Sequence, residues 1–460
     1  MENGLGYKAV NCWDRYDTPE DRSGMDGLAL EYIEFLSRCK TERETVAWVV
    51  EQATAAGCRE DVRGSLVVIP FRSKAVLLAR RGSGSLSQGL RLISAHVDTP
   101  HLDLKQHPLH EECRVALMKT HYYGGIKKYQ WLARPLALHG TVVTRDGRVV
   151  SICIGEDEHD PVFTVLDLLP HLARKQREET VEKAFVAEKL NLACGHEPAG
   201  SEDSSADKSD DARVRQRVLE LLHERYAIIE EDLFSAELQV VPAGRARFVG
   251  LDRSLIGGYG QDDRLCVFAS VKAFLNASQA EYTQVLVLTD REEIGCEGAT
   301  SAKSRFMENA LADIVEAWEP QSRLRHVLAR TRAVSADVHC PLDPDYQDVH
   351  DKLNASLLGC GPVFSKFTGH GGKYGASEAD CEYVAWFRAL LAQQNIPWQL
   401  AEMGKVDEGG GGTVARDLAV YGMEVIDFGP GVLSMHSPFE ISSKADLYAT
   451  VKAYHAFFRS

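Results

Sequence analysis

The 460-residue sequence contains no long apolar run and no basic N-terminal stretch. A membrane-spanning helix needs about 18 or more apolar residues in succession, so we expect no such helix and no membrane partner. The first 22 residues are polar and carry acidic side chains early, which is unlike a secretory signal. We therefore expect no secretory signal at this N-terminus.

Positive charge is also scarce. The chain has 52 Lys and Arg residues against 67 Asp and Glu residues, which gives a formal net charge of -15. Nucleic acids and anionic membranes bind basic faces, so we expect neither as a main partner. The net charge does not predict the charge of a substrate, because a local site can oppose it.

The cysteines lack any pairing pattern. There are eleven of them, an odd number, with scattered spacing and no C-x-x-C motif. This usage is typical of reduced thiols in a cytoplasmic protein, and it argues against a disulfide framework or a zinc-thiolate site.

Several familiar catalytic motifs are missing as well. The sequence has no H-E-x-x-H, no G-x-S-x-G and no P-loop, and the glycine-rich "DEGGGGT" at 407–413 has no Lys before its Thr. A phosphate cradle is therefore not expected. We also find no internal repeat.

The apolar residues that are present predict an α/β protein. Residues 25–57 have helical spacing that ends on Gly57, and three strands are expected at "SLVVIP", "AVLLAR" and "LRLISAHVD". After residue 255 helices and strands alternate again, with helices in "DRLCVFASVKAFLNA" and "SEADCEYVAWFRALLAQQ" and buried strands in "TQVLVLTD" and "MEVIDFG". This alternation favours a mainly parallel sheet flanked by helices.

A region of different texture interrupts this pattern. From about residue 105 to 250 we expect short strands with polar interruptions, including a hairpin around Asp146 and Gly147. The acidic stretch 194–216 is expected to be a mobile loop. The interpretation is one α/β domain, residues 1–100 and 251–460, with a β-rich insert at 101–250.

Five segments place ionisable side chains just after an apolar run, which is where open α/β sheets bind ligands. They are "LISAHVDTP" (His96, Asp98), "GGYGQDDRLC" (Asp262, Asp263), "VLTDREEIGCEG" (Glu292, Glu293), "AVSADVH" (Asp337, His339) and "GVLSMHSPFE" (His436). Taken singly, each has an ordinary explanation, such as a solvated strand end, a helix N-cap or a packed histidine. Together they suggest two cations held by His, Asp and Glu. Mixed nitrogen and oxygen ligands indicate zinc, with cobalt or manganese as substitutes.

Two of these segments suggest how the roles divide. Asp98 lies two residues after His96, where its carboxylate can orient a metal-bound imidazole. Of two adjacent glutamates at a strand end, one can bind a metal while the other faces the water that the metal activates.

The segments also form a recognisable set. "SAHVDTPHLD", "GQDDRLC", "DREEIG", "SADV", "GGKYGASEAD", "VDEGGGGT" and "VLSMHSPFEISSKAD" together resemble the aspartyl aminopeptidase / aminopeptidase I family of binuclear zinc metallopeptidases, over about residues 10–460. The resemblance implies that Glu292 is the general base and that Asp98 supports His96. It implies the following zinc ligands: His96 and Asp337 on one ion, Glu293 and His436 on the other, and Asp262 as the bridge.

The resemblance also implies an assembly. The β-rich insert would mediate dimerisation, and dimers would build a tetrahedral dodecamer in which a histidine of the insert, His171 here, reaches a neighbouring subunit's site. His339 and Lys366 would contact the substrate. Relatives that prefer acidic residues carry a His three positions after the ligand Asp, whereas this chain has Cys340 there.

The expected function is removal of single N-terminal residues from peptides that have a free N-terminus. One alternative is a related binuclear carboxypeptidase or deacylase, which would require a free carboxylate instead of a free amine. Another is a self-assembling cargo or scaffold protein with a decayed site. All five predicted ligands and Glu292 are present, which argues against decay.

Overall fold

The computed structural model describes residues 6–200 and 212–460, and these form two compact units. The first unit contains residues up to Thr99 together with 246–435 and 439–460. The second contains residues 100–245 together with 436–438. Each unit is described separately below.

The first unit is built on an eight-stranded sheet with the strand order β1-β2-β13-β3-β14-β17-β15-β16. The strands are β1 Leu66–Phe71, β2 Ala75–Arg80, β3 Leu90–His96, β13 Thr283–Thr289, β14 Arg332–Ser335, β15 Val363–Ser365, β16 Gln399–Leu400 and β17 Glu424–Gly429. The four central strands β13, β3, β14 and β17 are parallel, while β1, β2 and β15 pair with their neighbours on the central side antiparallel. The α/β prediction is confirmed, but the sheet is mixed at its edges.

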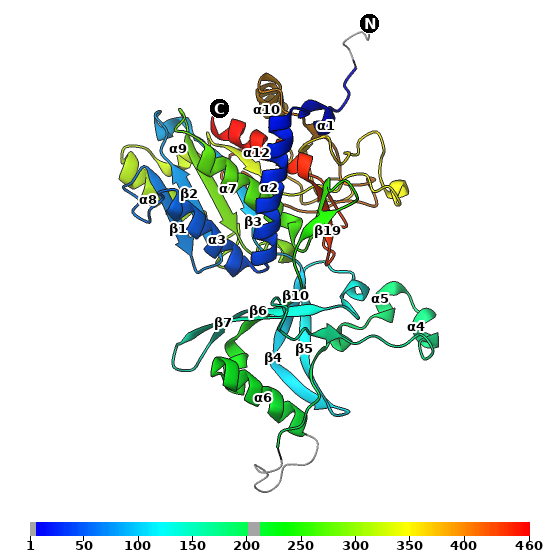
Figure 1. The fold of residues 1–460 in the computed structure, drawn as a ribbon. Helices are drawn as coiled ribbons and strands as arrows, with labels where there is room; N and C mark the ends of the chain where they lie inside the picture. Colours follow the sequence, from blue (N-terminus) through cyan, green and yellow to red (C-terminus); the bar gives the residue numbers. More distant parts are fainter. Residues whose placement is uncertain (1–5, 201–211) are drawn as a thin grey trace. The chain divides into compact units, whose positions relative to one another are not determined.

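Helices cover both faces of this sheet. Successive strand residues point to opposite sides, so the apolar strands contribute to two cores, one on each face. On β13, Leu286 and Leu288 enter one apolar core, and Val285 and Val287 enter the other. The first core packs against helices α2 Pro19–Arg38, α3 Glu42–Ala55, α7 Gln261–Asn276, α10 Cys381–Gln393 and α12 Lys444–Phe458. The second packs against α8 Phe306–Trp318 and α9 Leu324–Leu328, which Figure 1 labels, and against α11 Ala415–Ala419.

The two N-terminal helices match their prediction, apart from an earlier start. Helix α2 begins at Pro19, six residues before the predicted start, because the Thr18 hydroxyl accepts from the Asp21 N–H and Pro19 occupies the first turn. Helix α3 has a capping box of Thr41 and Glu44 and ends before Gly57, whose φ is +98°. A short helix, α1 Cys12–Arg15, precedes them.

A smaller sheet of four strands completes the first unit. Its order is β11-β12-β19-β18, with β11 Arg247–Val249, β12 Leu255–Gly258, β18 Val432–Leu433 and β19 Glu440–Ser443. Strand β12 leads directly into the loop that opens helix α7, and β19 leads into α12.

The second unit is a seven-stranded antiparallel sheet in the order β7-β6-β10-β4-β5-β9-β8. Its strands are β4 His101–Glu112, β5 Val115–Tyr123, β6 Leu136–Val143, β7 Val149–Ile154, β8 Thr164–Val165, β9 Leu192–Gly195 and β10 Glu237–Pro242. The hairpin prediction is confirmed, since β6 and β7 flank a turn in which Gly147 has a φ of +85°. The prediction of short strands is wrong for β4 and β5, which are 12 and 9 residues long.

Helix α6, Arg213–Tyr226, was not predicted. It buries Val214 and Val218. Its other face is polar and charged, so the helical spacing of the apolar residues was not recognised in the sequence. The predicted mobile loop at 194–216 is therefore wrong for 213–216, which open this helix, and for Cys194 and Gly195, which end β9. Residues 201–211 of that stretch lie outside the described residues. No helix in the described ranges is long and apolar enough to cross a membrane.

The start of β3 depends on Gly89, and this generates a stability prediction. Gly89 has a φ of +96°, and an added Cβ would overlap the carbonyl oxygen of Arg330. Gly57 has nearly the same φ, +98°, but nothing lies within 4 Å of its Cβ position. We expect Gly57→Ala to cost about 1–2 kcal/mol from the left-handed backbone alone, and Gly89→Ala about 1–3 kcal/mol more from the overlap. Thermal melting checks this, and equal shifts for the two variants would contradict it.

Candidate metal centre

His96 is the last residue of β3, and its ring is buried. The ring Nδ1 lies 3.0 Å from the backbone carbonyl of Asp98 and 3.3 Å from its carboxylate Oδ1. Both partners accept hydrogen bonds, so the proton belongs on Nδ1. The lone pair of Nε2 is then available to a metal ion.

Carboxylates surround that nitrogen. Nε2 lies 3.2 Å from Asp262 Oδ1 and 3.9 Å from Asp337 Oδ1. His96, Asp262 and Glu293 each offer one ligand atom, and these atoms lie within 4.8 Å of one another. The atoms offered by His96, Asp263 and Asp337 meet the same limit. The chain thus brings four of its five predicted ligands together, with Asp263 as an addition.

The first turn of helix α7 is irregular and aims both aspartates at His96. Gly260, with a φ of +76°, is the N-cap of the helix, so Asp262 is not the cap. Asp262 has a ψ of 107°, outside the helical range, and its N–H and that of Gln261 donate to the Glu440 carboxylate at 3.3 and 2.5 Å. The turn leaves Asp262 Oδ1 beside Nε2, while Asp263 Oδ2 accepts from the backbone N–H of His96 at 3.3 Å.

The adjacent glutamates lie in a single 3₁₀ turn, Glu292–Ile294, just after β13. The N–H of Glu292 donates to Asp98 Oδ1 at 3.1 Å, and the N–H of Glu293 donates to Asp98 Oδ2 at 3.2 Å. The two oxygens of Asp98 therefore hold the backbone of both glutamates. Their side chains remain half-buried and do not take part in these bonds.

The electrostatics of the cluster call for a cation. Burial raises the pKa of Asp263 and of Asp337, and neighbouring carboxylates raise both further. Burial alone would lower the pKa of His96, but its contacts with Asp262 and Asp98 outweigh burial and raise it. Gathered in a buried place, these acids repel one another until a positive charge joins them. One imidazole with several carboxylate oxygens is a donor set that suits zinc.

Comparison with known proteins also supports zinc as the metal of this family. The model of the family described as "Aminopeptidase I zinc metalloprotease (M18)" matches residues 35–458. The chain is 44% identical to a probable M18 family aminopeptidase 1 of Clostridium acetobutylicum, with 99% of both chains covered. The protein belongs to the M18 family of zinc metallopeptidases.

Solved M18 structures share the fold. An M18 aminopeptidase of Thermotoga maritima has a TM-score of 0.92 and 42% identity, covering 99% of this chain and 100% of that one. Aminopeptidase I of Clostridium acetobutylicum has a TM-score of 0.92 and 43% identity, with the same coverage. The predicted family and the predicted peptidase class are confirmed, and the aminopeptidase reading is favoured over the carboxypeptidase, deacylase and scaffold alternatives.

Two predicted site residues, His436 and His171, belong to the second unit. His436 has a φ of +63°, and its Nδ1 lies 2.9 Å from the carbonyl oxygen of Gly125. That contact places its proton on Nδ1, so Nε2 is the atom that would coordinate a metal ion. His171 is exposed and makes no hydrogen bond or ion pair with any described residue. Their roles stay predictions.

The two predicted substrate-binding residues lie in the first unit. His339 is buried, its Nδ1 is 3.2 Å from the Ser356 hydroxyl, and burial lowers its pKa to about 4. It is therefore neutral at pH 7. Lys366 follows β15, and its Nζ lies 3.7 Å from Glu378 Oε1. Their contact with substrate also stays a prediction.

Sequence reasoning named Asp263 beside Asp262 but assigned a metal only to Asp262. The signal was present in the adjacent pair of aspartates in "GQDDRLC". Deciding how two neighbouring carboxylates share a metal centre requires the backbone angles of that turn, which the sequence does not display.

Asp98 contacts the ring of His96 and the backbone of both glutamates, and this generates the second prediction. We expect Asp98→Ala to weaken zinc binding about 10–100-fold, because His96 loses an orienting contact and both glutamate N–H groups lose their acceptor. Competition with a chromophoric chelator measures this affinity. Asp61→Ala is the matched control, since Asp61 also accepts a backbone N–H, that of Arg63 at 3.1 Å, at an exposed turn. Zinc affinity equal to wild type in Asp98→Ala would show that these contacts of Asp98 do not support the metal centre.

Proposed function

We propose that the protein removes single N-terminal residues from peptides at a centre of two zinc ions. The ligands would be His96, Asp262, Glu293, Asp337 and His436, with Asp262 as the bridge. The observation that supports this most directly is the pair of ligand groups that share His96. Asp263 would support the ion that Asp337 holds. When bound, zinc ions would polarise the scissile carbonyl of the substrate and would activate a water at neutral pH.

Glu292 would act as the general base. Its backbone is held by Asp98 next to Glu293, and its charge helps to raise the pKa of Asp337, yet it belongs to neither ligand group. There it would take a proton from the attacking water and return it to the leaving amine. Glu293 offers a ligand atom and Glu292 does not, and this difference supports different roles for the two glutamates.

The excess of carboxylates supports specificity for a free N-terminus. When ionised, Asp262, Asp263, Asp337 and the two glutamates carry five negative charges, which exceed the four positive charges of two zinc ions. An ammonium group of a peptide N-terminus would be attracted to this excess, whereas a peptide carboxylate would be repelled. This favours removal of N-terminal residues over C-terminal ones.

We also propose that the chain assembles with copies of itself into dimers and then a dodecamer. A segment of the second unit exposes apolar side chains that a partner surface would cover. They are Val162, Leu166, Leu168, Leu169, Leu172, Val181 and Val186. His171 lies within this segment, which supports a role for its imidazole in a neighbouring subunit's site. One solved structural neighbour is described as a dodecamer of a yeast aminopeptidase.

A cytoplasmic location is part of the proposal. All eleven cysteines are free thiols, and several are buried, such as Cys12 and Cys266. A reducing compartment keeps such thiols in this state.

The division of roles between the glutamates can be tested directly. We expect Glu292→Gln to retain its zinc but to lose about 10²–10⁴-fold in turnover, the usual contribution of a general base. Glu293→Gln should lose zinc, because an amide oxygen is a poorer ligand than a carboxylate. Elemental analysis and hydrolysis of aminoacyl reporter substrates measure both properties. Equal zinc loss in the two variants would refute the assignment.

The assembly proposal predicts an effect of a single charge. Leu172 is 68% exposed, and Leu172→Lys would place an ammonium group in the proposed interface. We expect light scattering to give a mass near twelve chains of 50.9 kDa for wild type and a clearly smaller assembly for the variant. Val420→Lys, at a position 83% exposed in the first unit, is the control. A wild-type mass of one chain would overturn the proposal.

A further inference from the structure

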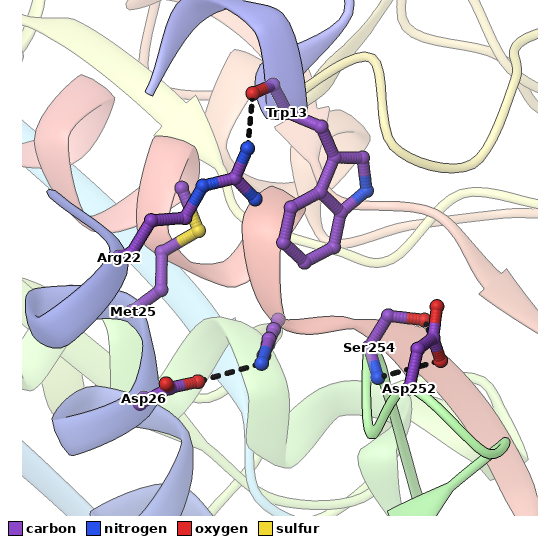
Figure 2. Close-up of a pocket in the computed structure, with 7 residues that line it drawn as sticks. Trp13, Arg22, Met25, Asp26, Asp252 and Ser254 are labelled. Atoms are coloured by element: carbon purple, nitrogen blue, oxygen red, sulfur yellow. Dashed lines mark hydrogen bonds and ion pairs between the residues drawn. The ribbon is translucent and has the colours of Figure 1, made fainter. Parts of the chain in front are cut away.

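A cavity of about 340 Å³ lies in the first unit and contains none of the residues of the metal centre. Its lining side chains come from four elements: α1, α2, the turn before β12 and the start of α12 (Figure 2). They are Trp13, Arg22, Met25, Asp26, Asp252, Ser254 and Lys444.

The elements hold these side chains in fixed relation. Arg22, Met25 and Asp26 are spaced by three and four residues on α2, so they share one face of that helix. The backbone N–H of Lys444, the first residue of α12, donates to the carbonyl of Ser254 at 3.2 Å. The turn and the helix start are therefore tied together at one side of the cavity.

Two cations have unused donors in this cavity. The Arg22 Nη2 donates to the Trp13 carbonyl at 2.5 Å, and the guanidinium lies 4.9 Å from the centre of the indole. Among the described residues, the other N–H groups of Arg22 have no hydrogen-bond partner. Lys444 Nζ donates to Asp26 Oδ1 at 2.6 Å, and its side chain is only 11% exposed. An ammonium group has three donors, so Lys444 retains two.

Two carboxylates likewise have one oxygen engaged and one available. Asp26 uses Oδ1 for Lys444. Asp252 uses Oδ1 for the backbone N–H and hydroxyl of Ser254, at 3.2 and 2.9 Å. These bonds lower the pKa of Asp252, which keeps it ionised at neutral pH. The second oxygen of each has no partner in the part of the chain that the structure describes.

The balance of charges restricts the ligand. A simple anion would meet two carboxylates, and a simple cation would meet an arginine and a lysine. A purely apolar molecule would desolvate the Lys444–Asp26 ion pair and would leave Arg22 and Asp252 without a charged partner. A zwitterion with an apolar substituent satisfies every group. The volume is near the lower end of the range for small-molecule sites, about 300–1,000 Å³, which suits a single residue better than a peptide.

We propose that this cavity binds a free α-amino acid with an apolar side chain. The ligand carboxylate pairs with Arg22 and Lys444, and its ammonium group pairs with Asp26 and Asp252. Its side chain lies against the indole of Trp13 and the thioether of Met25. Free amino acids are also products of the proposed peptidase. That connection rests on the proposed function, whereas the cavity and its charges do not.

The test must separate this cavity from product binding at the metal centre. Equilibrium dialysis of the full chain with radiolabelled leucine, in the presence of zinc, is carried out on wild type, Asp262→Asn and Arg22→Gln. Asp262→Asn removes a proposed metal ligand and should retain binding. Arg22→Gln removes a charged partner of the carboxylate and should weaken binding at least tenfold. Arg63→Gln is the control, because Arg63 pairs with Asp61 at an exposed turn, and it should bind as wild type does.

The opposite pattern would overturn the proposal. Leucine binding that is lost in Asp262→Asn and unchanged in Arg22→Gln is binding at the metal centre. Absence of saturable leucine binding in both wild type and Asp262→Asn would also refute the proposal. Neither result bears on the peptidase function, which zinc content and peptide hydrolysis measure separately.

A panel of analogues keeps the proposal testable even if Arg22→Gln fails to fold. In Asp262→Asn, N-acetyl-leucine lacks the ammonium group and leucinamide lacks the carboxylate. Each should compete with radiolabelled leucine at least tenfold more weakly than unlabelled leucine does. Competition by either analogue as strong as that of leucine would show that the cavity does not recognise a zwitterion.

Discussion

The carboxylate of Asp98 connects two strands that the rest of the metal centre depends on. One oxygen accepts from Glu292 and the other from Glu293, while the ring of His96 lies 3.3 Å from the first of these oxygens. Strands β3 and β13 are parallel neighbours in which Thr289 is opposite His96, so the residues after both strands emerge at one edge. Asp98 converts this shared edge into a defined geometry for the histidine and both glutamates.

That geometry carries an electrostatic cost. Several carboxylates are buried near one imidazole, and burial raises the pKa of Asp263 and Asp337. The fold keeps these carboxylates close together. Asp262 and Asp263 are in the first turn of α7 and Asp337 follows β14, and α7 and β14 both pack in the main apolar core. The fold thus holds like charges together, and this is the condition in which a protein binds a divalent cation tightly.

The apolar parts of the site were readable from the sequence for a simple reason. A strand such as "TQVLVLTD" is buried on both faces, so it consists of successive apolar residues, and the first polar residues after it mark the edge of the sheet. Helix α6 was missed because only Val214 and Val218 are buried, among arginines and glutamates that also fit a loop. Asp263 was given no role because adjacent residues in a regular segment point apart, whereas the non-helical backbone at the start of α7 brings both carboxylates to His96.

The sequence by itself determined the α/β class, the family, and the set of strand-end acids and histidines from which a zinc site could be built. These follow from the order of residues, since burial and strand ends leave a pattern along the chain. Only the tertiary structure decided which carboxylates meet at His96 and that Asp98 binds both glutamate N–H groups. It also brought Trp13, Arg22, Asp252 and Lys444 around one cavity. Such contacts join residues up to several hundred positions apart, and their distances depend on how helices and strands pack, which no local pattern records.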